Sequence, residues 1–447
     1  MGDDDHRRDD QQGEGGVMPL DIISFLEARK AQKAAEQAAL NPNRGVAQMG
    51  DSRMEYVKNN LEDRTVPAYS TRQNGLQGYL KSVMRGRVEV PLSLNVSHAG
   101  DTTETIEGQI PAMLASDSGT VLLLGGTNDR TFGRTLGWTF ERTRDSLSRS
   151  INAVLSSGRN LVLIAELPRG EPGTFANRRL SGQNLEDHYR IRQWCLSLAG
   201  THRRLAVVDA WPEFADPTST TGDAKAGYLI DGLHLSAFGN YRLAEMIRPA
   251  LERFYPAHNV LVAQNGDRYS ATNSTGNLVS NGMMGGSAGT LSGGATGVAP
   301  DGWSLIGTAG ATVVGSKYDA TTFQIDVSGT PTGTTINLQQ SVTLANVSAG
   351  DILQATADIE IVSVTQPYRA VQSGLLLSGA STVTAYELID MNLPLQFAWS
   401  GIHRGEAVPV PPSPTLVRAV VSIIPVQSAA AGITIRVRSF SVRKVPA

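Results

Sequence analysis

Apolar runs and polar breaks alternate over the first half of the chain in the pattern of a layered α/β fold. Short apolar segments predict strands over Val46–Met49, Val88–Val96, Val121–Leu124, Leu161–Ala165 and Leu205–Val208. Helical spacing of apolar residues predicts helices over Trp138–Ser157 and Tyr241–Phe254. An uninterrupted apolar run such as VLLL is typical of a parallel strand that is covered on both faces. The alternation of strands and helices therefore predicts a three-layer α/β/α domain with a parallel sheet over residues 44–258.

The pattern changes after about residue 259. A Gly-, Ser- and Thr-rich stretch comes first, and charged residues then become sparse. Apolar and polar residues alternate singly over 322–327 and 433–438, which is the period of a half-buried strand. Short strands separated by Gly, Ser and Pro turns predict an antiparallel β-sandwich over residues 259–447.

The N-terminal residues 1–43 form a third segment. Residues 1–16 are charged and poor in apolar residues, which predicts disorder. Pro19–Leu40 has a helical pattern, with Asp21 as a candidate cap and Asn41-Pro42-Asn43 as the stop. This helix can pack on its own domain or attach the chain to a partner, and the sequence leaves both open.

Composition narrows the function classes. A net charge of −3 argues against nucleic acid as the main partner, because phosphate binding needs a concentrated basic surface. The chain contains no long apolar run that predicts a membrane span, and its N-terminus lacks the apolar core of a secretory signal. The single cysteine, Cys195, excludes an intrachain disulfide and lies in a helix-like stretch, where a small buried apolar residue is expected.

The first candidate catalytic residue is Ser52. It follows Gly50-Asp51 at the point where a strand gives way to a helix, which exposes a hydroxyl at the carboxyl end of a parallel sheet. A serine hydroxyl is a weak nucleophile until a base removes its proton. The alternative is that Asp51 or Ser52 only caps the following helix.

His234 is the candidate base. Asp231 precedes it by three residues, a spacing that lets the carboxylate reach one ring nitrogen while the other faces Ser52. The carboxylate would fix the tautomer of the ring and stabilise the imidazolium. The alternative is an ordinary surface turn before the last helix of the domain.

Acyl transfer also needs hydrogen-bond donors for the oxyanion. Gly100 follows a predicted strand, where the missing side chain lets its backbone N–H approach a substrate. Asn128 follows the VLLLGG run and carries an amide donor, and the backbone N–H of Ser52 is a third donor. Each residue alone is also compatible with an ordinary turn, but all three can meet at one edge of the sheet.

These four segments together resemble the SGNH, or GDSL-like, hydrolase family. Its blocks are matched by Gly50-Asp51-Ser52, by Gly100, by Gly126-Thr127-Asn128-Asp129, and by Asp231-Gly232-Leu233-His234. NLVLIAELP and DGLHLSAFGNYRLAEMI resemble flanking segments of the same family. The resemblance implies a flavodoxin-like fold, with Ser52 as nucleophile, His234 as base, Asp231 as orienting acid, and Ser52, Gly100 and Asn128 as the oxyanion hole. It leaves Asp129 to order its loop.

Four further residues are candidates for substrate contacts: Arg53, His98, Arg130 and Trp138. Arg53 directly follows the nucleophile and can bind an anionic substrate or lie on the outer face of its helix. Arg130 and Trp138 belong to an insertion after Asn128, and a second insertion spans 169–180. Both insertions are rich in Arg and lack the broad apolar stretch of an acyl-chain tunnel, which favours a short acyl group on a polar carrier.

No cofactor and no metal site are predicted. The remaining histidines lack carboxylate or cysteine companions at metal-ligand spacing; they are His188, His202, His258 and His403.

The C-terminal segment resembles the jelly-roll, carbohydrate-binding-like modules of phage tail and spike proteins, with NLVSNGMMGG and PDGW as the cue. Aromatic residues there can stack on sugars or fill the core; they are Trp303, Tyr318, Tyr368, Tyr386 and Trp399.

The sequence therefore predicts a serine esterase that removes short acyl groups, O-acetyl above all, from a bacterial surface polysaccharide. The expected setting is a phage or phage-like particle, to which the N-terminal helix would attach the chain, and a homo-oligomer is left open. The alternatives are a glycan-binding spike protein that keeps the fold without turnover, a lipase or thioesterase, and a cytoplasmic location.

Overall fold

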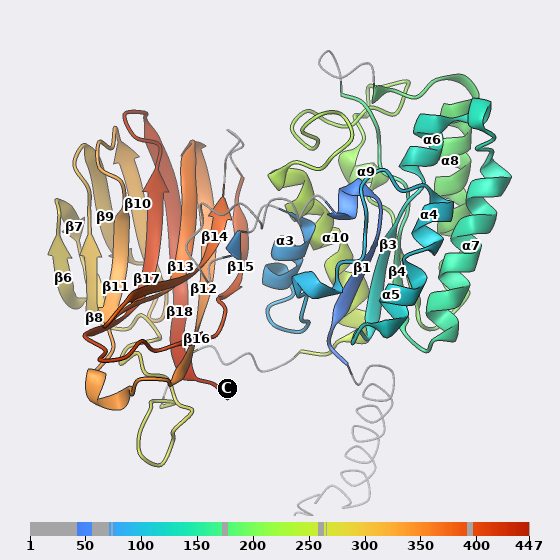
Figure 1. Ribbon diagram of the computed structural model, residues 1–447. Helices are drawn as coiled ribbons and strands as arrows, with labels where there is room; N and C mark the ends of the chain where they lie inside the picture. The colour runs from blue at the N-terminus through green and yellow to red at the C-terminus, as the bar shows by residue number, and fades with distance from the viewer. Residues whose placement is uncertain are drawn as a thin grey trace, which may run out of the picture.

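The computed structural model describes residues 43–55, 71–72, 75–171, 178–257, 263–264, 266–390 and 397–446. An α/β domain and a β-sandwich lie side by side (Figure 1). The predicted tail and helix of residues 1–42, His258 and the predicted boundary at 258–259 lie outside the described residues. No helix in the described ranges is long and apolar enough to cross a membrane.

A four-stranded parallel sheet forms the middle layer of the α/β domain, in the order β1-β3-β4-β5. Its strands are β1 (Val46–Gly50), β3 (Thr120–Leu124), β4 (Asn160–Ile164) and β5 (Leu205–Val208). The first three are buried along their whole length. This is the environment that their uninterrupted apolar runs predict.

Helices cover both faces of this sheet. They are α3 (Leu76–Val83), α4 (Thr103–Glu107), α5 (Ile110–Ala115), α6 (Thr127–Phe132), α7 (Phe140–Ser156), α8 (Gly182–Ser197), α9 (Trp211–Phe214) and α10 (Ala237–Phe254), with 3-10 turns at Leu92–Leu94 and Arg134–Leu136. Along β3, Val121 and Leu123 pack with the apolar side chains of α7 and α8. Leu122 and Leu124 point to the opposite face and pack with α3 and α10. The predicted three-layer α/β/α fold is confirmed.

Two helices begin at residues other than those predicted, because the residue that caps each helix fixes its first turn. α7 starts at Phe140 because the Thr139 hydroxyl accepts a hydrogen bond from the N–H of Arg142. α10 starts at Ala237, earlier than predicted, because Ser236 caps it through the N–H of Gly239.

The predicted strand over 88–96 is wrong. Only isolated bridges form there, between Glu89 and Gly45 and between Asn95 and Gln48. A 3-10 turn follows Pro91 and separates the two bridges. Proline has no N–H to donate to a sheet, so it breaks the ladder at this point.

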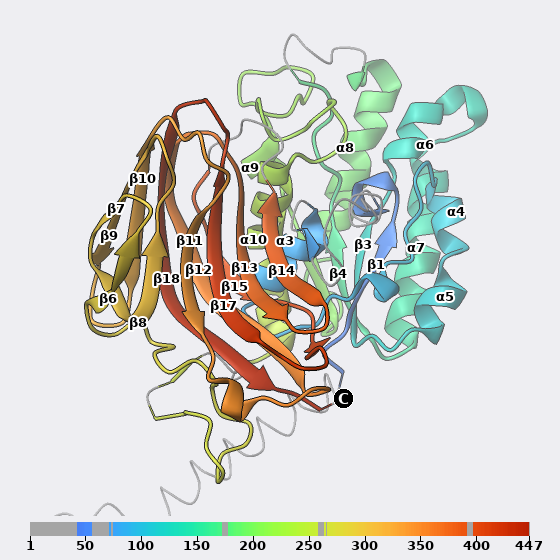
Figure 2. The same ribbon diagram turned by 60° about the vertical axis from the view of Figure 1, so that its left-hand side comes forward.

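The C-terminal part folds into two sheets that face each other, which confirms the predicted sandwich (Figure 2). One sheet has the order β2-β14-β13-β17-β11-β8-β6, and the other has the order β15-β12-β18-β10-β9-β7, with β16 paired to β12. The strands are β2 (Thr71–Arg72), β6 (Ala288–Ser292), β7 (Ala295–Gly297), β8 (Ala299–Ile306), β9 (Ala311–Lys317), β10 (Phe323–Gly329), β11 (Ile336–Ser341), β12 (Ile352–Gln366), β13 (Tyr368–Ser378), β14 (Thr382–Asp390), β15 (Trp399–Arg404), β16 (Val408–Pro409), β17 (Leu416–Pro425) and β18 (Ala431–Lys444). Most pairs are antiparallel, and the alternation of buried and partly exposed residues along β10 follows the sequence pattern.

The two parts of the molecule are joined by more than a linker. β2, which lies between β1 and α3 in the sequence, pairs in parallel with β14 of the sandwich. Phe397 of the sandwich is buried against three aromatic rings of α3 and α10, with centroid distances of 6.3 Å to Tyr79, 5.4 Å to Tyr241 and 5.3 Å to Phe238. Lys81 of α3 donates a 2.6 Å hydrogen bond to the carbonyl of Arg404. The apolar core therefore runs continuously from the α/β domain into the sandwich.

Most of the candidate sugar-stacking aromatics are core residues. Trp303, Tyr368 and Trp399 are buried. Tyr318 is exposed, and the guanidinium of Arg436 lies 3.5 Å from its ring centroid. Cys195 is buried on α8, as predicted.

Two buried histidines make the stability of the fold sensitive to acid. Burial lowers the pKa of both His188 and His403 from 6.5 to about 4. Between these values the unfolded chain binds protons that the folded chain does not, so the free energy of unfolding falls as the pH falls from 6.5 to 4. We expect a loss of about 3 kcal/mol for each histidine across this window.

Urea unfolding between pH 7 and pH 4 measures this loss. His403→Gln should make the loss smaller by about 3 kcal/mol, because one of the two buried histidines is removed. His202→Gln, at an exposed position, is the matched control. An unchanged slope in His403→Gln would contradict the assignment.

Candidate active site

Ser52 stands at a sharp turn where β1 ends. Gly50 precedes it, and a Cβ at Gly50 would lie 2.2 Å from the carbonyl oxygen of Leu124 on β3, so only glycine fits there. The side chain of Gln109 holds both backbone groups of Gly50, with distances of 2.9 Å to its N–H and 2.8 Å to its carbonyl. The turn that contains Ser52 is therefore held in place by contact with β3 and by Gln109, the residue before α5.

The structure brings Ser52, His234 and Asp231 together. The Nε2 atom of His234 lies 2.9 Å from the Ser52 hydroxyl, and its Nδ1 atom lies 2.8 Å from Asp231 Oδ2. The other oxygen of Asp231 accepts hydrogen bonds from the backbone N–H groups of Leu233 (3.0 Å) and His234 (2.8 Å). Ser52 is 9% exposed, so its hydroxyl lies at the edge of the buried interior.

The charge on Asp231 decides which nitrogen of His234 carries the proton. Burial raises the pKa of the Asp231 carboxyl, but hydrogen bonds from His234 and Leu233 outweigh it and lower the pKa to about 2. The ionised carboxylate accepts the Nδ1–H of His234, so Nε2 is left to accept the proton of the Ser52 hydroxyl. This is the arrangement that activates a serine.

Of the three predicted oxyanion donors, Ser52 and Asn128 lie in helical turns that follow β1 and β3, and Gly100 lies in a loop. The loop of Gly100 contacts the nucleophile turn through the N–H of His98, which donates a 3.2 Å hydrogen bond to the carbonyl of Gly50. Gly100 has φ +83°, and no atom lies within 4 Å of the place where its Cβ would be. Asn128 donates one amide hydrogen to the carbonyl of Asp101 (2.9 Å), and a primary amide has a second N–H for a ligand.

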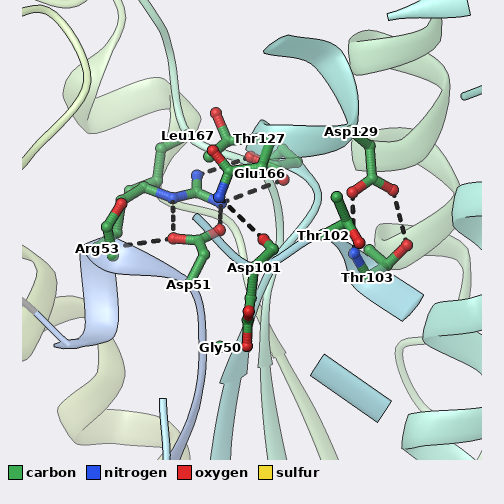
Figure 3. A network of polar contacts seen from close by, with 12 residues as sticks. Gly50, Asp51, Arg53, Asp101, Thr102, Thr103, Thr127, Asp129, Glu166 and Leu167 are labelled. Carbon is green, nitrogen blue, oxygen red and sulfur yellow. Dashed lines mark hydrogen bonds and ion pairs between the residues drawn. The ribbon is translucent and has the colours of Figure 1, made fainter. Parts of the chain in front are cut away.

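Asp129 orders its surroundings, as predicted. It is buried and accepts hydrogen bonds from the N–H (2.9 Å) and hydroxyl (2.7 Å) of Thr103 and from the hydroxyl of Thr143 (2.7 Å). Figure 3 shows Asp129 facing Thr103. These bonds tie the Asn128 turn to the starts of α4 and α7.

Three of the four predicted substrate contacts are corrected because the side chains are buried. Arg53 is 2% exposed and pairs with Asp51, so it neither lies on an outer helix face nor reaches a substrate. Arg130 is also 2% exposed and lies 3.4 Å from Asp187. Trp138 is buried, with the guanidinium of Arg142 at 4.1 Å from its ring centroid.

The fourth residue, His98, does reach solvent. Its side chain is 62% exposed and lies 3.9 Å from Glu55. It remains a candidate for a substrate contact. The described residues contain no cluster of three or more His, Cys, Asp or Glu that could hold a metal ion.

Two residues of the site were missed in the sequence. Arg178, at the end of the second insertion, is 41% exposed and lies 3.9 Å from Asp231 Oδ2. Glu166 is buried just beyond β4 and pairs with Arg53 at 2.8 Å. A usable signal existed for Glu166, since a carboxylate in an apolar segment must be paired when it is buried.

A serine, a histidine and a carboxylate in hydrogen-bonded series, at the carboxyl edge of a parallel three-layer sheet, define a serine hydrolase of the α/β/α class. Residues 49–242 match the model of the GDSL-like Lipase/Acylhydrolase family. The chain thus contains a GDSL-like lipase/acylhydrolase domain.

Several solved structures are similar to part of this chain. A putative acylhydrolase from Bacteroides fragilis is 15% identical, with a TM-score of 0.36, covering 47% of this chain and 87% of the other. Est24, a carbohydrate acetylesterase from Sinorhizobium meliloti, is 18% identical (TM-score 0.33; 47% and 100% covered). The acetyl xylan esterase AlAXEase is 16% identical (TM-score 0.33; 46% and 99% covered). No curated protein sequence is significantly similar to this chain.

Proposed function

We propose that the protein is a serine esterase that removes short acyl groups, chiefly O-acetyl, from a polysaccharide. The observation that carries the proposal is the hydrogen-bonded series from Ser52 through His234 to Asp231, at 2.9 Å and 2.8 Å. The family match supports acyl ester hydrolysis in general. That the ester belongs to a polysaccharide is an additional part of the proposal.

The geometry supports a two-stage reaction. In the first stage the Ser52 oxygen attacks the carbonyl carbon of the ester while His234 Nε2 takes the hydroxyl proton, and the carbonyl oxygen becomes an oxyanion. The N–H groups of Ser52, Gly100 and Asn128 stabilise that charge. The oxyanion then collapses, the C–O bond to the sugar breaks, and His234 returns the proton to the leaving alkoxide.

Water completes the cycle. It loses a proton to His234 and attacks the acyl–Ser52 carbonyl, and the bond to Ser52 breaks as the serine oxygen regains a proton. Acetate and free Ser52 are the products. Asp231 stays ionised throughout and stabilises the imidazolium in both stages.

Polar side chains at the rim support a sugar substrate. Arg178 and His98 are 41% and 62% exposed near the triad and near Gly100, respectively. Such groups can bind the hydroxyls and carboxylates of a glycan, whereas a long acyl chain needs an apolar channel.

The proposal includes a place for the enzyme. We propose that it acts from the surface of a phage or phage-like particle on bacterial surface glycan, with residues 1–43 as the attachment segment. This rests on the sequence alone. Antibodies against the chain should decorate purified particles, and unlabelled particles would exclude this location.

Release of acetate from intact polysaccharide tests the function. The full chain should release acetate from at least one member of a panel of O-acetylated bacterial capsules, and none from the same capsules after alkaline de-O-acetylation. With a chain-length series of 4-nitrophenyl esters, kcat/KM should be highest for acetate and fall with length.

Two other results would replace the proposal. A maximum of kcat/KM at long acyl chains identifies a lipase or thioesterase. Glycan binding without acetate release, and without labelling of Ser52 by a fluorophosphonate, identifies a binding protein that keeps the fold without turnover.

A further inference from the structure

Three buried charged side chains, those of Asp51, Arg53 and Glu166, form a chain of ion pairs, and the first two flank Ser52 in the sequence. The Arg53 guanidinium donates to both oxygens of Asp51, at 3.0 Å and 2.7 Å, and to both oxygens of Glu166, at 2.8 Å and 3.3 Å. The side chains of Arg53, Asp51 and Glu166 are 1%, 0% and 2% exposed. Figure 3 shows the guanidinium between the two carboxylates, above the ends of the strands.

This chain of ion pairs crosses the sheet. Arg53 follows β1 and Glu166 follows β4, and the sheet order β1-β3-β4 places β3 between them. The turn after β3 is Gly125-Gly126, and a Cβ at Gly126 would lie 2.6 Å from Glu166 Oε1. Glu166 therefore packs on the turn that leads to Asn128, while its partner Arg53 is covalently joined to Ser52.

Stability alone does not account for such a pair. Removing two charges from water costs several kcal/mol, and apolar residues of the same volume often give a fold that is equally stable. What a bidentate guanidinium–carboxylate pair adds is fixed geometry, because its parallel hydrogen bonds define both distance and orientation. Here that geometry links the turn of the nucleophile to the turn of an oxyanion donor.

We propose that Arg53 and Glu166 are positioning residues, whose ion pair fixes the Ser52 turn relative to the Asn128 turn. The inference rests on the proposed function only in taking Ser52 as the nucleophile. Neither residue touches the substrate; both act through the backbone turns that they join.

Two conservative variants test the inference. Arg53→Lys keeps a charge but loses the planar fork, and Glu166→Gln keeps the shape but loses the charge. We expect kcat for 4-nitrophenyl acetate to fall by about 10- to 100-fold in each, because small errors in the placement of reacting groups have effects of this size. KM should change by no more than about twofold, since the substrate's own contacts remain. The rate constant for fluorophosphonate labelling of Ser52 should fall in parallel with kcat.

Arg443→Lys is the matched control. Arg443 is a buried arginine of the sandwich that pairs with Asp267, far in the sequence from every candidate catalytic residue. Arg443→Lys and Arg53→Lys should both lower the midpoint of thermal unfolding, but only Arg53→Lys should lower kcat per folded molecule. If kcat and the labelling rate of folded Arg53→Lys and Glu166→Gln equal those of the wild type, the inference is overturned.

The wild-type results separate this inference from the proposed function. Ser52 labelling and nitrophenyl acetate turnover without acetate release from any capsule would overturn the polysaccharide assignment and leave the positioning inference to the variants. A wild type that neither labels nor turns over any ester would overturn both.

Discussion

Ser52→Ala is expected to lower kcat for ester hydrolysis by about 10⁴-fold or more, because the variant has no oxygen to form the acyl-enzyme. His234→Ala should cause a loss of similar size, since His234 Nε2 is the group within 2.9 Å that can take the Ser52 proton. The double variant should lose little beyond either single one, because the two side chains act as a unit. Initial rates with 4-nitrophenyl acetate, normalised to folded protein, measure all three.

A change of this size must come from chemistry and not from misfolding. Ser52→Ala removes a single oxygen at the edge of the buried interior, so the free energy of unfolding should stay within about 1 kcal/mol of the wild type. Ser148→Ala, a serine on α7 remote from His234 in the sequence, is the control and should keep full activity. A Ser52→Ala variant with more than about one hundredth of the wild-type kcat would show that another group is the nucleophile.

The layers of the fold could be predicted from the sequence because a strand that is buried on both faces has an uninterrupted run of apolar residues. Runs such as Val121–Leu124 are apolar without interruption, and β3 is fully buried along them. Residues 88–96 show the limit of this reasoning, since Val88, Val90 and Leu94 are buried in the core without belonging to a strand. The pairing of β2 with β14 leaves no such trace, because a strand of two residues is too short to show a period.

In the candidate site, too, contacts between residues close in the sequence could be predicted, and contacts between distant residues could not. Asp231 and His234 are three residues apart and meet through one local loop, so their contact could be expected from the sequence. Whether the Arg53 side chain is buried could not be predicted in this way, because its partner Glu166 is distant in the sequence. The two side chains meet because β1 and β4 end at the same edge of the sheet. Pairing between distant residues decided whether a charged side chain points to solvent or into the core.

The second large expected effect is a loss of stability when the contact between the α/β domain and the sandwich is weakened. Phe397→Ala is expected to lower the free energy of unfolding by about 3–5 kcal/mol, as for other fully buried phenylalanines. Phe397 is 7% exposed and packs against Tyr79, Phe238 and Tyr241. Its removal leaves a cavity between the two parts of the molecule. Urea unfolding followed by circular dichroism, which reports the whole chain, and by loss of ester hydrolysis, which reports the α/β domain, measures the effect.

The two signals should change together, because the shared core makes the α/β domain and the sandwich one cooperative unit. In Phe397→Ala both midpoints should move to lower urea by the same amount. Phe132→Ala, the same substitution at a side chain that is 41% exposed, should move neither by more than about 0.5 kcal/mol. If ester hydrolysis in Phe397→Ala is lost at the wild-type urea concentration, the α/β domain is stable without its neighbour. The sandwich would then be an attached module and not part of the hydrolase fold, and its removal should leave a working esterase.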